Sequence, residues 1–184
     1  AAMAATVLKS LVLEAIQFTT SPAEILTRIN RRYAEIIMPG HFATMVVLVI
    51  DTNNMTVSCA SAGHEPPFIQ QSGLPVERLL TGGLVLGVDE EVCYDEETLS
   101  VAVGTRVLLV SDGVTEAFDP EDNQFGTGRI SEALQELSID CDINDVVQNL
   151  KSRLTEFRGT RPAFDDTTLL AVELQMPTND ELCA

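Results

Sequence analysis

Hydrophobic positions at the start of the chain follow the spacing of an α-helix. Apolar residues recur every three or four positions over residues 3–16, which predicts one buried helical face. No capping residue precedes this segment, so we expect the chain to begin inside a helix. The stretch Ser21-Pro22-Ala23-Glu24 then has the composition of a helix start, with Ser as the cap and Glu completing a capping box. We expect this second helix to run to about Tyr33.

The next segments have the pattern of β-strands. Residues 44–50 form a β-branched run, residues 51–54 have turn chemistry, and residues 55–61 alternate, which together predict an antiparallel hairpin. Residues 66 and 67 are both proline and should prevent simple continuation of the second strand. Residues 73–87 are rich in glycine and are expected to form a loop that crosses one face, without a regular element.

Two further strands are expected at residues 98–103 and 106–110, with a turn at Gly104 between them. The segment 106–110 is the most continuously apolar strand of the chain, so we expect it to be central in its sheet.

The last third of the chain is expected to contain a long polar loop, two helices and one strand. The pattern predicts the loop at residues 119–128, helices at 129–137 and 143–158, and the strand at 167–174. Residues 178–184 are expected to be a frayed tail.

Paired helices and strands mostly in hairpins predict an α+β fold with antiparallel sheet, because regular strand-helix alternation is missing. A length of 184 residues favours a single domain, which we expect to occupy residues 1–177.

The composition excludes several classes of function. The formal net charge is −17, which disfavours binding to nucleic acid or to an anionic membrane surface. No apolar run is long enough to span a bilayer, so we expect no membrane insertion and a cytoplasmic protein. The four cysteines lack metal-site spacing and are expected to be reduced bystanders.

Three aspartates stand where buried strands begin or end. The strand at 106–110 runs directly into Ser111-Asp112-Gly113, and Asp165 and Asp166 come immediately before the last strand. If these strands are neighbours with matching ends, three carboxylates converge, and such hard oxygen ligands suit Mg²⁺ or Mn²⁺. The alternative is that these aspartates only accept hydrogen bonds from backbone amides.

Other candidates have simpler interpretations. Ser111 and His64 could form a hydrolase pair, but no nucleophile-elbow motif and no orienting acid accompany them. We favour a loop imidazole at His64 that holds backbone groups. The acidic run 90–97 is expected to be a solvated edge rather than a partner-binding segment. The pair Phe125-Gly126 predicts either a mobile flap or a loop closed onto the core.

Six motifs in order resemble the SpoIIE/RsbU-type branch of the PPM (PP2C-like) serine/threonine phosphatases. They are Phe42-Ala43-Thr44-Met45, Ala62-Gly63-His64-Glu65-Pro66-Pro67, Gly83-Leu84-Val85-Leu86-Gly87, Ser111-Asp112-Gly113-Val114-Thr115-Glu116-Ala117, Phe125-Gly126 and Asp165-Asp166-Thr167-Thr168. The resemblance implies an antiparallel β-sandwich flanked by paired helices. It also implies hydrolysis of phosphoserine or phosphothreonine on a protein by a water that two Mn²⁺ or Mg²⁺ ions activate.

The resemblance also implies roles for individual residues. Asp112 and Asp165 match metal ligands of the family, and Asp166 is a further candidate ligand. The loop positions Gly113, His64 and Gly126 are assigned to substrate binding. The implied substrate is a phosphorylated regulatory protein of the anti-sigma-factor-antagonist type, and an upstream sensor or receiver domain is compatible with the pattern.

The start of the chain departs from the family. An early strand pair and an Asp-x-Ser-Gly-His-Gly-like motif, which supply further metal ligands in the family, are missing before residue 1. We therefore expect a fragment of a phosphatase, and a shortened relative without turnover is the alternative. Two other classes remain open: a non-catalytic PP2C-like docking module, and a small ligand-binding α+β domain unrelated to phosphatases.

Overall fold

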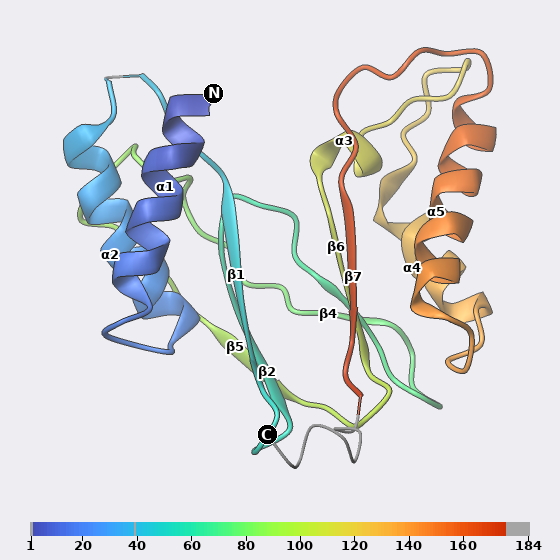
Figure 1. Ribbon diagram of the computed structural model, residues 1–184. Helices are drawn as coiled ribbons and strands as arrows, with labels where there is room; N and C mark the ends of the chain where they lie inside the picture. The colour runs from blue at the N-terminus through green and yellow to red at the C-terminus, as the bar shows by residue number, and fades with distance from the viewer. Residues whose placement is uncertain (1, 39, 176–184) are drawn as a thin grey trace. The chain divides into compact units, whose positions relative to one another are not determined.

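The structure is a computed structural model that describes residues 2–38 and 40–175 (Figure 1). It divides into two compact units. Unit 1 contains the chain up to Pro66 together with Leu79–Ser100, and unit 2 contains Pro67–Arg78 and the chain from Val101 onward. Each unit contains an antiparallel sheet and a pair of longer helices, which confirms the α+β prediction. The expected domain limits of 1–177 stay a prediction, and the expected tail at 178–184 lies outside the described residues.

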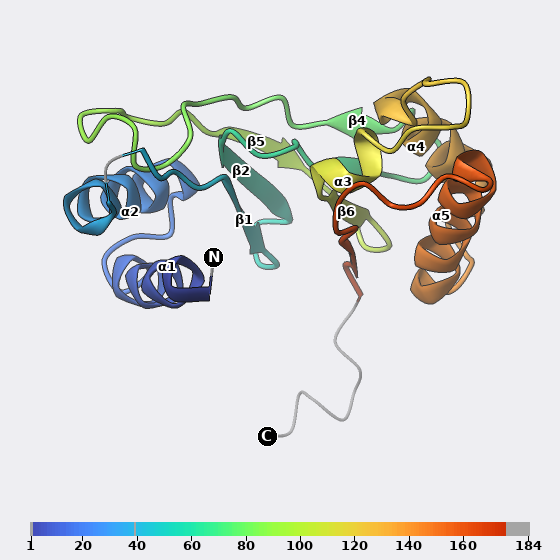
Figure 2. The same cartoon turned by 90° about the horizontal axis from the view of Figure 1, so that it is seen from above.

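Unit 1 packs two helices on a three-stranded sheet. The helices are α1 (Ala2–Ala15) and α2 (Pro22–Ile36). The strands β1 (Met45–Asp51), β2 (Thr56–Ala62) and β5 (Glu97–Ser100) lie in the order β1-β2-β5. Figure 2 shows α1 and α2 side by side, and α2 contacts both β1 and β2. Both expected helices and the expected hairpin are confirmed.

The start of α2 corrects one prediction. Ser21 caps the helix, since its Oγ accepts a hydrogen bond from the Glu24 amide at 3.2 Å. The Glu24 carboxylate does not return to the cap and pairs instead with Arg28 at 2.8 Å. Glu96 takes its place, because Ser21 Oγ and the Ala23 amide donate to Glu96 Oε2 at 2.5 and 3.1 Å. The positive end of the helix dipole also stabilises a carboxylate at this position.

The core of unit 1 lies between α2 and the sheet. Its larger buried side chains are Ile25, Leu26, Ile29, Tyr33, Leu86 and Tyr94. Asn30 is also fully buried in α2, where its Nδ2 donates to the Asp89 carbonyl at 2.7 Å and its Oδ1 accepts from the Gly87 amide at 2.9 Å. Both polar ends of this side chain are therefore satisfied, and the loop before the acidic run is tied to the helix.

Unit 2 contains a four-stranded antiparallel sheet. Its strands are β3 (Phe68–Gln70), β4 (Glu77–Arg78), β6 (Arg106–Val110) and β7 (Leu169–Glu173), in the order β4-β3-β6-β7. The prediction of a central strand at 106–110 is confirmed. The prediction of no regular element within 73–87 is wrong at β4.

The turn expected at Gly104 is present, with φ of +83° at this glycine. The strands on either side of it pair with different neighbours, because β5 pairs with β2 whereas β6 pairs with β3 and β7. The strand β5 also ends at Ser100, three residues earlier than expected.

Three helices lie between β6 and β7 in the sequence. They are the single turn α3 (Asp112–Thr115), α4 (Gly126–Glu136) and α5 (Ile143–Arg158). The bounds of α5 agree with the prediction, α4 begins three residues early, and α3 was not predicted. Figure 2 shows α4 and α5 side by side, and they contact β3 and β7 respectively. Within the part of the chain described, no helix is both long and apolar enough to cross a membrane.

Candidate functional site

The candidate site in unit 2 forms where β6 ends and β7 begins. The strands pair as far as Val110 and Leu169. Ser111 continues the contact, because its amide donates to the Thr168 carbonyl at 3.1 Å and its Oγ accepts from the Thr168 amide at 2.9 Å. Ser111 Oγ also donates to the Asp166 carbonyl at 3.2 Å. The hydroxyl of Ser111 therefore joins the two strand ends, and this role argues against a nucleophile.

Asp112 is the first residue of the single helical turn α3 and directly follows Ser111. Its Oδ1 accepts from the Gly113 amide at 2.9 Å, and its carbonyl accepts from the Glu116 amide at 2.8 Å. Gly113 lies against the segment before β7, where a Cβ at this position would overlap the Asp166 carbonyl oxygen. Glycine is therefore required for the two strand ends to approach this closely.

Asp165 lies in the segment before β7 that approaches Gly113. Its Oδ1 accepts from the Asp166 amide at 2.7 Å. Asp112, Asp165 and Asp166 are all exposed. The structure therefore contains the backbone hydrogen bonds of the simpler interpretation, and it also brings two of the three aspartates to one opening.

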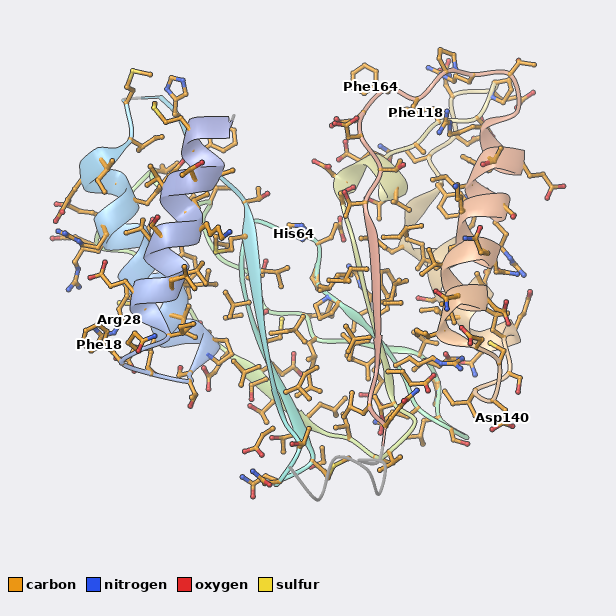
Figure 3. The ribbon with its side chains drawn as sticks, in the orientation of Figure 1. Phe18, Arg28, His64, Phe118, Asp140 and Phe164 are labelled. Atoms are coloured by element: carbon orange, nitrogen blue, oxygen red, sulfur yellow. The ribbon has the colours of Figure 1, made fainter. Side chains whose placement is uncertain are left out.

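That opening is a cavity of about 290 Å³ within unit 2. Both Asp112 and Asp165 line it, and Asp166 is not among its lining residues. Its charged and aromatic lining also includes Glu116, Phe118, Arg158, Arg161 and Phe164. Figure 3 shows Phe164 on the loop that leads into β7, where it is 94% exposed.

The donor set fits a divalent cation in part. In residues 2–38 and 40–175, no three His, Cys, Asp or Glu side chains lie close enough together to hold a metal ion, so the expected convergence of three carboxylates is not seen. Asp112 and Asp165 are hard oxygen donors at one cavity, whereas Mg²⁺ takes about six oxygen ligands, several of them water. Ligation by Asp112, Asp165 and Asp166 stays a prediction.

Two arginines at the cavity were missed by sequence reasoning. The side chain of Arg161 is held by the loop at 119–124, because its Nη1 donates to the Asp119 carbonyl at 2.9 Å and to Asp122 Oδ1 at 2.5 Å. Its guanidinium also lies 5.2 Å from the ring centre of Phe118. Arg158 is the last residue of α5. The sequence did contain a signal for these arginines. The chain has 11 basic and 28 acidic residues, and two of its few cations lie shortly before Asp165.

The loop that holds Arg161 is itself well ordered by hydrogen bonds. Asp119 Oδ1 accepts from the Glu121 and Asn123 amides at 3.0 and 2.8 Å, and Asn123 Nδ2 donates to Asp119 Oδ2 at 2.9 Å. The side-chain bond from Asn123, followed by the backbone bonds, keeps the pKa of Asp119 below its usual value.

The two loop glycines and Phe125 have distinct surroundings. Phe125 is buried and packs edge-on against Phe157, with ring centres 5.2 Å apart. Gly126 begins α4 with φ of +72°. Of the two interpretations of this motif, the structure supports the loop closed onto the core. Substrate binding by Gly113 and Gly126 is untested.

His64 belongs to unit 1, in the loop after β2. Its Nδ1 lies 3.1 Å from the Glu65 carbonyl, its amide donates to Ser61 Oγ at 3.1 Å, and Ser61 Oγ donates to the His64 carbonyl at 2.8 Å. These contacts match the favoured interpretation, a loop imidazole that holds backbone groups. A substrate contact by His64 stays a prediction.

Comparisons with known proteins show the family of the chain. Residues 1–175 match the family described as Stage II sporulation protein E (SpoIIE). Protein IcfG of Synechocystis sp. is 33% identical over 132 residues, which is 71% of this chain and 20% of that protein. Phosphoserine phosphatase RsbU of Bacillus subtilis is 28% identical over 152 residues, which is 82% of this chain and 44% of RsbU.

A solved structure supports the fold. The SiaA-PP2C domain of Pseudomonas aeruginosa matches with a TM-score of 0.79 at 19% identity, over 95% of this chain and 70% of that chain. The chain spans less than half the length of the two curated relatives above.

Proposed function

This chain belongs to the SpoIIE family and has the fold of PP2C phosphatase domains, and from this premise we propose that it is the catalytic part of a metal-dependent protein serine/threonine phosphatase. The observation that carries the proposal is the cavity of unit 2, which Asp112 and Asp165 line from two neighbouring strand ends. The name of RsbU states that it is a phosphoserine phosphatase, which supports the same reaction here.

The residues of the chain have separate roles in this proposal. Asp112 and Asp165 bind Mn²⁺ or Mg²⁺, with Asp166 as a further ligand, and Gly113 permits the approach of the two strand ends. A cation bound there supplies a water that ionises more readily and offsets negative charge on the phosphoryl oxygens. Because Asp112 and Asp165 supply two carboxylates, whereas such a cation takes about six oxygen ligands, we expect this chain to bind the cation weakly.

The substrate is proposed to be a folded, phosphorylated regulator of the anti-sigma-factor-antagonist type. A protein with a net charge of −17 repels acidic phosphopeptides in general. A complementary folded surface on the substrate offsets that repulsion, whereas a short peptide has none.

The test measures phosphate release by the intact protein from a phosphoserine regulator and from a peptide with the same phosphosite, at matched salt. We expect release with Mn²⁺ or Mg²⁺, none with a chelator, and a kcat/KM at least about tenfold higher for the folded regulator. Equal kcat/KM values would remove the docking argument. If neither substrate is hydrolysed with either metal, the docking-module interpretation replaces the enzyme.

A further inference from the structure

Arg158 is one of the two arginines that line the cavity. Its Nε is enclosed by protein and has no hydrogen-bond acceptor, and no ion pair involves its guanidinium among residues 2–38 and 40–175. The side chain is half-buried and lines the cavity together with Asp112 and Asp165. Because Nε is enclosed, a ligand in the cavity would meet the terminal Nη groups of this side chain, which also have no ion pair within the described residues.

The backbone around Arg158 is held in place. The Arg161 amide donates to the Arg158 carbonyl at 2.9 Å, and the Gly159 amide donates to the Thr155 and Glu156 carbonyls at 3.1 Å. The end of α5 is therefore fixed by local hydrogen bonds. A guanidinium on a fixed backbone loses less conformational freedom when it binds a ligand.

Arg161 offers a comparison within the same cavity. It already donates to a carbonyl and a carboxylate of the 119–124 loop. Its hydrogen-bonding capacity is therefore partly used for structure. Of the two arginines that line the cavity, Arg161 has an ion pair, whereas Arg158 has none within residues 2–38 and 40–175.

The chemistry of the cavity selects the ligand. Asp112, Glu116 and Asp165 carry negative charge there, so a phosphoryl group needs a cation to offset their repulsion. The planar fork of a guanidinium matches two phosphoryl oxygens in a bidentate contact. A half-buried guanidinium in this position suits a phosphate ester better than an uncharged ligand.

We propose that Arg158 binds the phosphoryl group of the substrate, and thereby positions it at the cavity that Asp112 and Asp165 line. This inference rests on the proposed phosphatase function for the identity of the substrate. The phosphate contact itself has a test that does not need turnover.

The test uses inorganic phosphate and the ¹H–¹⁵N signals of the arginine Nε–H groups, with a chelator present so that no metal contributes. The Arg158 signal is assigned by its loss in Arg158→Lys. We expect phosphate to shift the Arg158 signal and to leave the Arg161 signal nearly unchanged. Phosphate affinity, followed by the amide signals of the cavity, should fall about tenfold in Arg158→Gln, since a charge-assisted bidentate contact is lost.

Three variants keep the result interpretable. Arg161→Gln removes the other cavity arginine, and Arg153→Gln removes one charge from the same helix at a residue that pairs with Glu136 outside the cavity. Arg158→Lys keeps the charge but loses the fork and should retain part of the affinity. Far-ultraviolet circular dichroism and thermal unfolding check that each variant folds.

Specific outcomes overturn the inference. An equal loss of affinity in Arg158→Gln and Arg153→Gln means that net charge alone acts. Unchanged affinity in Arg158→Gln, or no phosphate shift of the Arg158 signal in the unaltered chain, means that Arg158 only offsets the neighbouring carboxylates. Phosphate binding at Arg158 without phosphatase activity of the intact protein would leave this inference standing and remove the proposed function.

Discussion

Unit 1 and unit 2 each pair two helices with an antiparallel sheet, and the six motifs that resemble the family divide between them, three to each when the motif at 62–67 is counted with unit 1, which holds all of it but Pro67. In unit 1 the motifs meet through close packing. Gly63 lies against Val85, Gly83 lies against the Ser61 carbonyl, and a β-bridge joins Ala43 to Leu86. These motifs therefore shape the loops around the sheet of unit 1.

In unit 2 two of the motifs, at residues 111–117 and 165–168, meet at an opening. Ser111 joins the ends of β6 and β7, Gly113 permits their approach, and Asp112 and Asp165 stay exposed at the cavity. The residue types separate the two cases, because small and apolar residues make the close contacts of unit 1, whereas exposed carboxylates face the cavity of unit 2 and contribute little to stability there. Motifs of the same family therefore have different structural roles, which are loop packing in unit 1 and the placement of exposed carboxylates at a cavity in unit 2.

The largest expected effect is on catalysis in unit 2. Asp112→Asn or Asp165→Asn in the intact protein should lower phosphatase activity about 100-fold or more, because a neutral amide is a poor ligand for a hard cation. The free energy of unfolding should change by less than about 0.5 kcal/mol, since both side chains are exposed. Phosphate-release assays and urea unfolding measure the two quantities.

Glu116→Gln is the matched control for these variants, because Glu116 lines the same cavity. It should keep most of the activity, and calorimetric titration with Mn²⁺ should show weaker binding only in the aspartate variants. Tight metal binding that survives Asp112→Asn would move the metal site elsewhere. Unit 1 supplies a second control, since His64→Ala should reduce activity less than either aspartate change.

The next effect is on stability in unit 1. In Gly83→Ala the new Cβ would lie 2.7 Å from the Ser61 carbonyl oxygen and 2.6 Å from the Tyr94 ring. Tyr94 is buried, and its hydroxyl donates to the Leu84 carbonyl at 2.9 Å, so it cannot move without cost. We expect a loss of about 3 kcal/mol in unfolding free energy, the upper range for overpacking.

The neighbouring Gly82→Ala is its control. A Cβ at Gly82 meets nothing within 4 Å, so urea unfolding should show a change below about 1 kcal/mol. Equal losses in both variants would show that loop conformation, rather than the contact with Tyr94, sets the requirement for glycine.

A third effect distinguishes the units by their response to acid. In unit 2, Arg106 is 2% exposed and its Nε donates to Glu173 Oε2 at 2.8 Å. This hydrogen bond, followed by one from Gln175, holds the pKa of Glu173 below its usual value of 4.5. The pair therefore stabilises the fold above the unfolded-state pKa, and its contribution is lost as pH falls below about 4.5 through the folded-state pKa.

Glu173→Gln should cost about 2 kcal/mol at pH 7, because a buried guanidinium loses its charged partner. It should also flatten the decline of stability between about pH 5 and pH 3. Asp51→Asn is the unit 1 control. The amides of Asn54 and Asn53 lower the pKa of Asp51 in an exposed turn. Asp51→Asn should therefore reduce the free energy of unfolding at pH 7 by less than Glu173→Gln does. Urea unfolding across pH measures both, and identical profiles would contradict the assignment to Glu173.

The sequence predicted the elements whose signals are local. The helix α5 was predicted to the residue, because Asp142 caps it through the Asn144 amide at 2.7 Å and Gly159 ends it with φ of +53°. The strands β3 and β4 were not predicted, since elements of three and two residues depend on pairing partners distant in the sequence. The same limit explains Glu96, which caps a helix more than 70 residues away.

The candidate site was predictable to the same extent. Asp112 and Asp165 were predicted to be close because the end of one antiparallel strand meets the start of its neighbour. Arg158 was not predicted, because its place at the cavity depends on where the end of α5 lies relative to β6 and β7. Charge alone could not distinguish it from Arg161 or Arg153.

The smallest effect on stability is expected at two exposed phenylalanines, one in each unit. Phe164 is 94% exposed on the rim of the unit 2 cavity, and Phe18 is 65% exposed beside Arg28 in unit 1. Phe164→Ala and Phe18→Ala should each change the unfolding free energy by less than about 0.5 kcal/mol, because little apolar surface is buried at either site. Thermal unfolding measures this for both variants.

Their effects on turnover should differ. An exposed aromatic residue beside a reactive cavity is suited to contact a protein substrate, so Phe164→Ala should raise the KM for a folded phosphorylated regulator about fivefold with little change in kcat. Phe18→Ala should leave both constants unchanged, and the KM for a small phosphate ester should be unchanged in both variants. A rise in KM for the small ester in Phe164→Ala would place the effect inside the cavity instead. An unchanged KM for the regulator would exclude Phe164 from the docking surface.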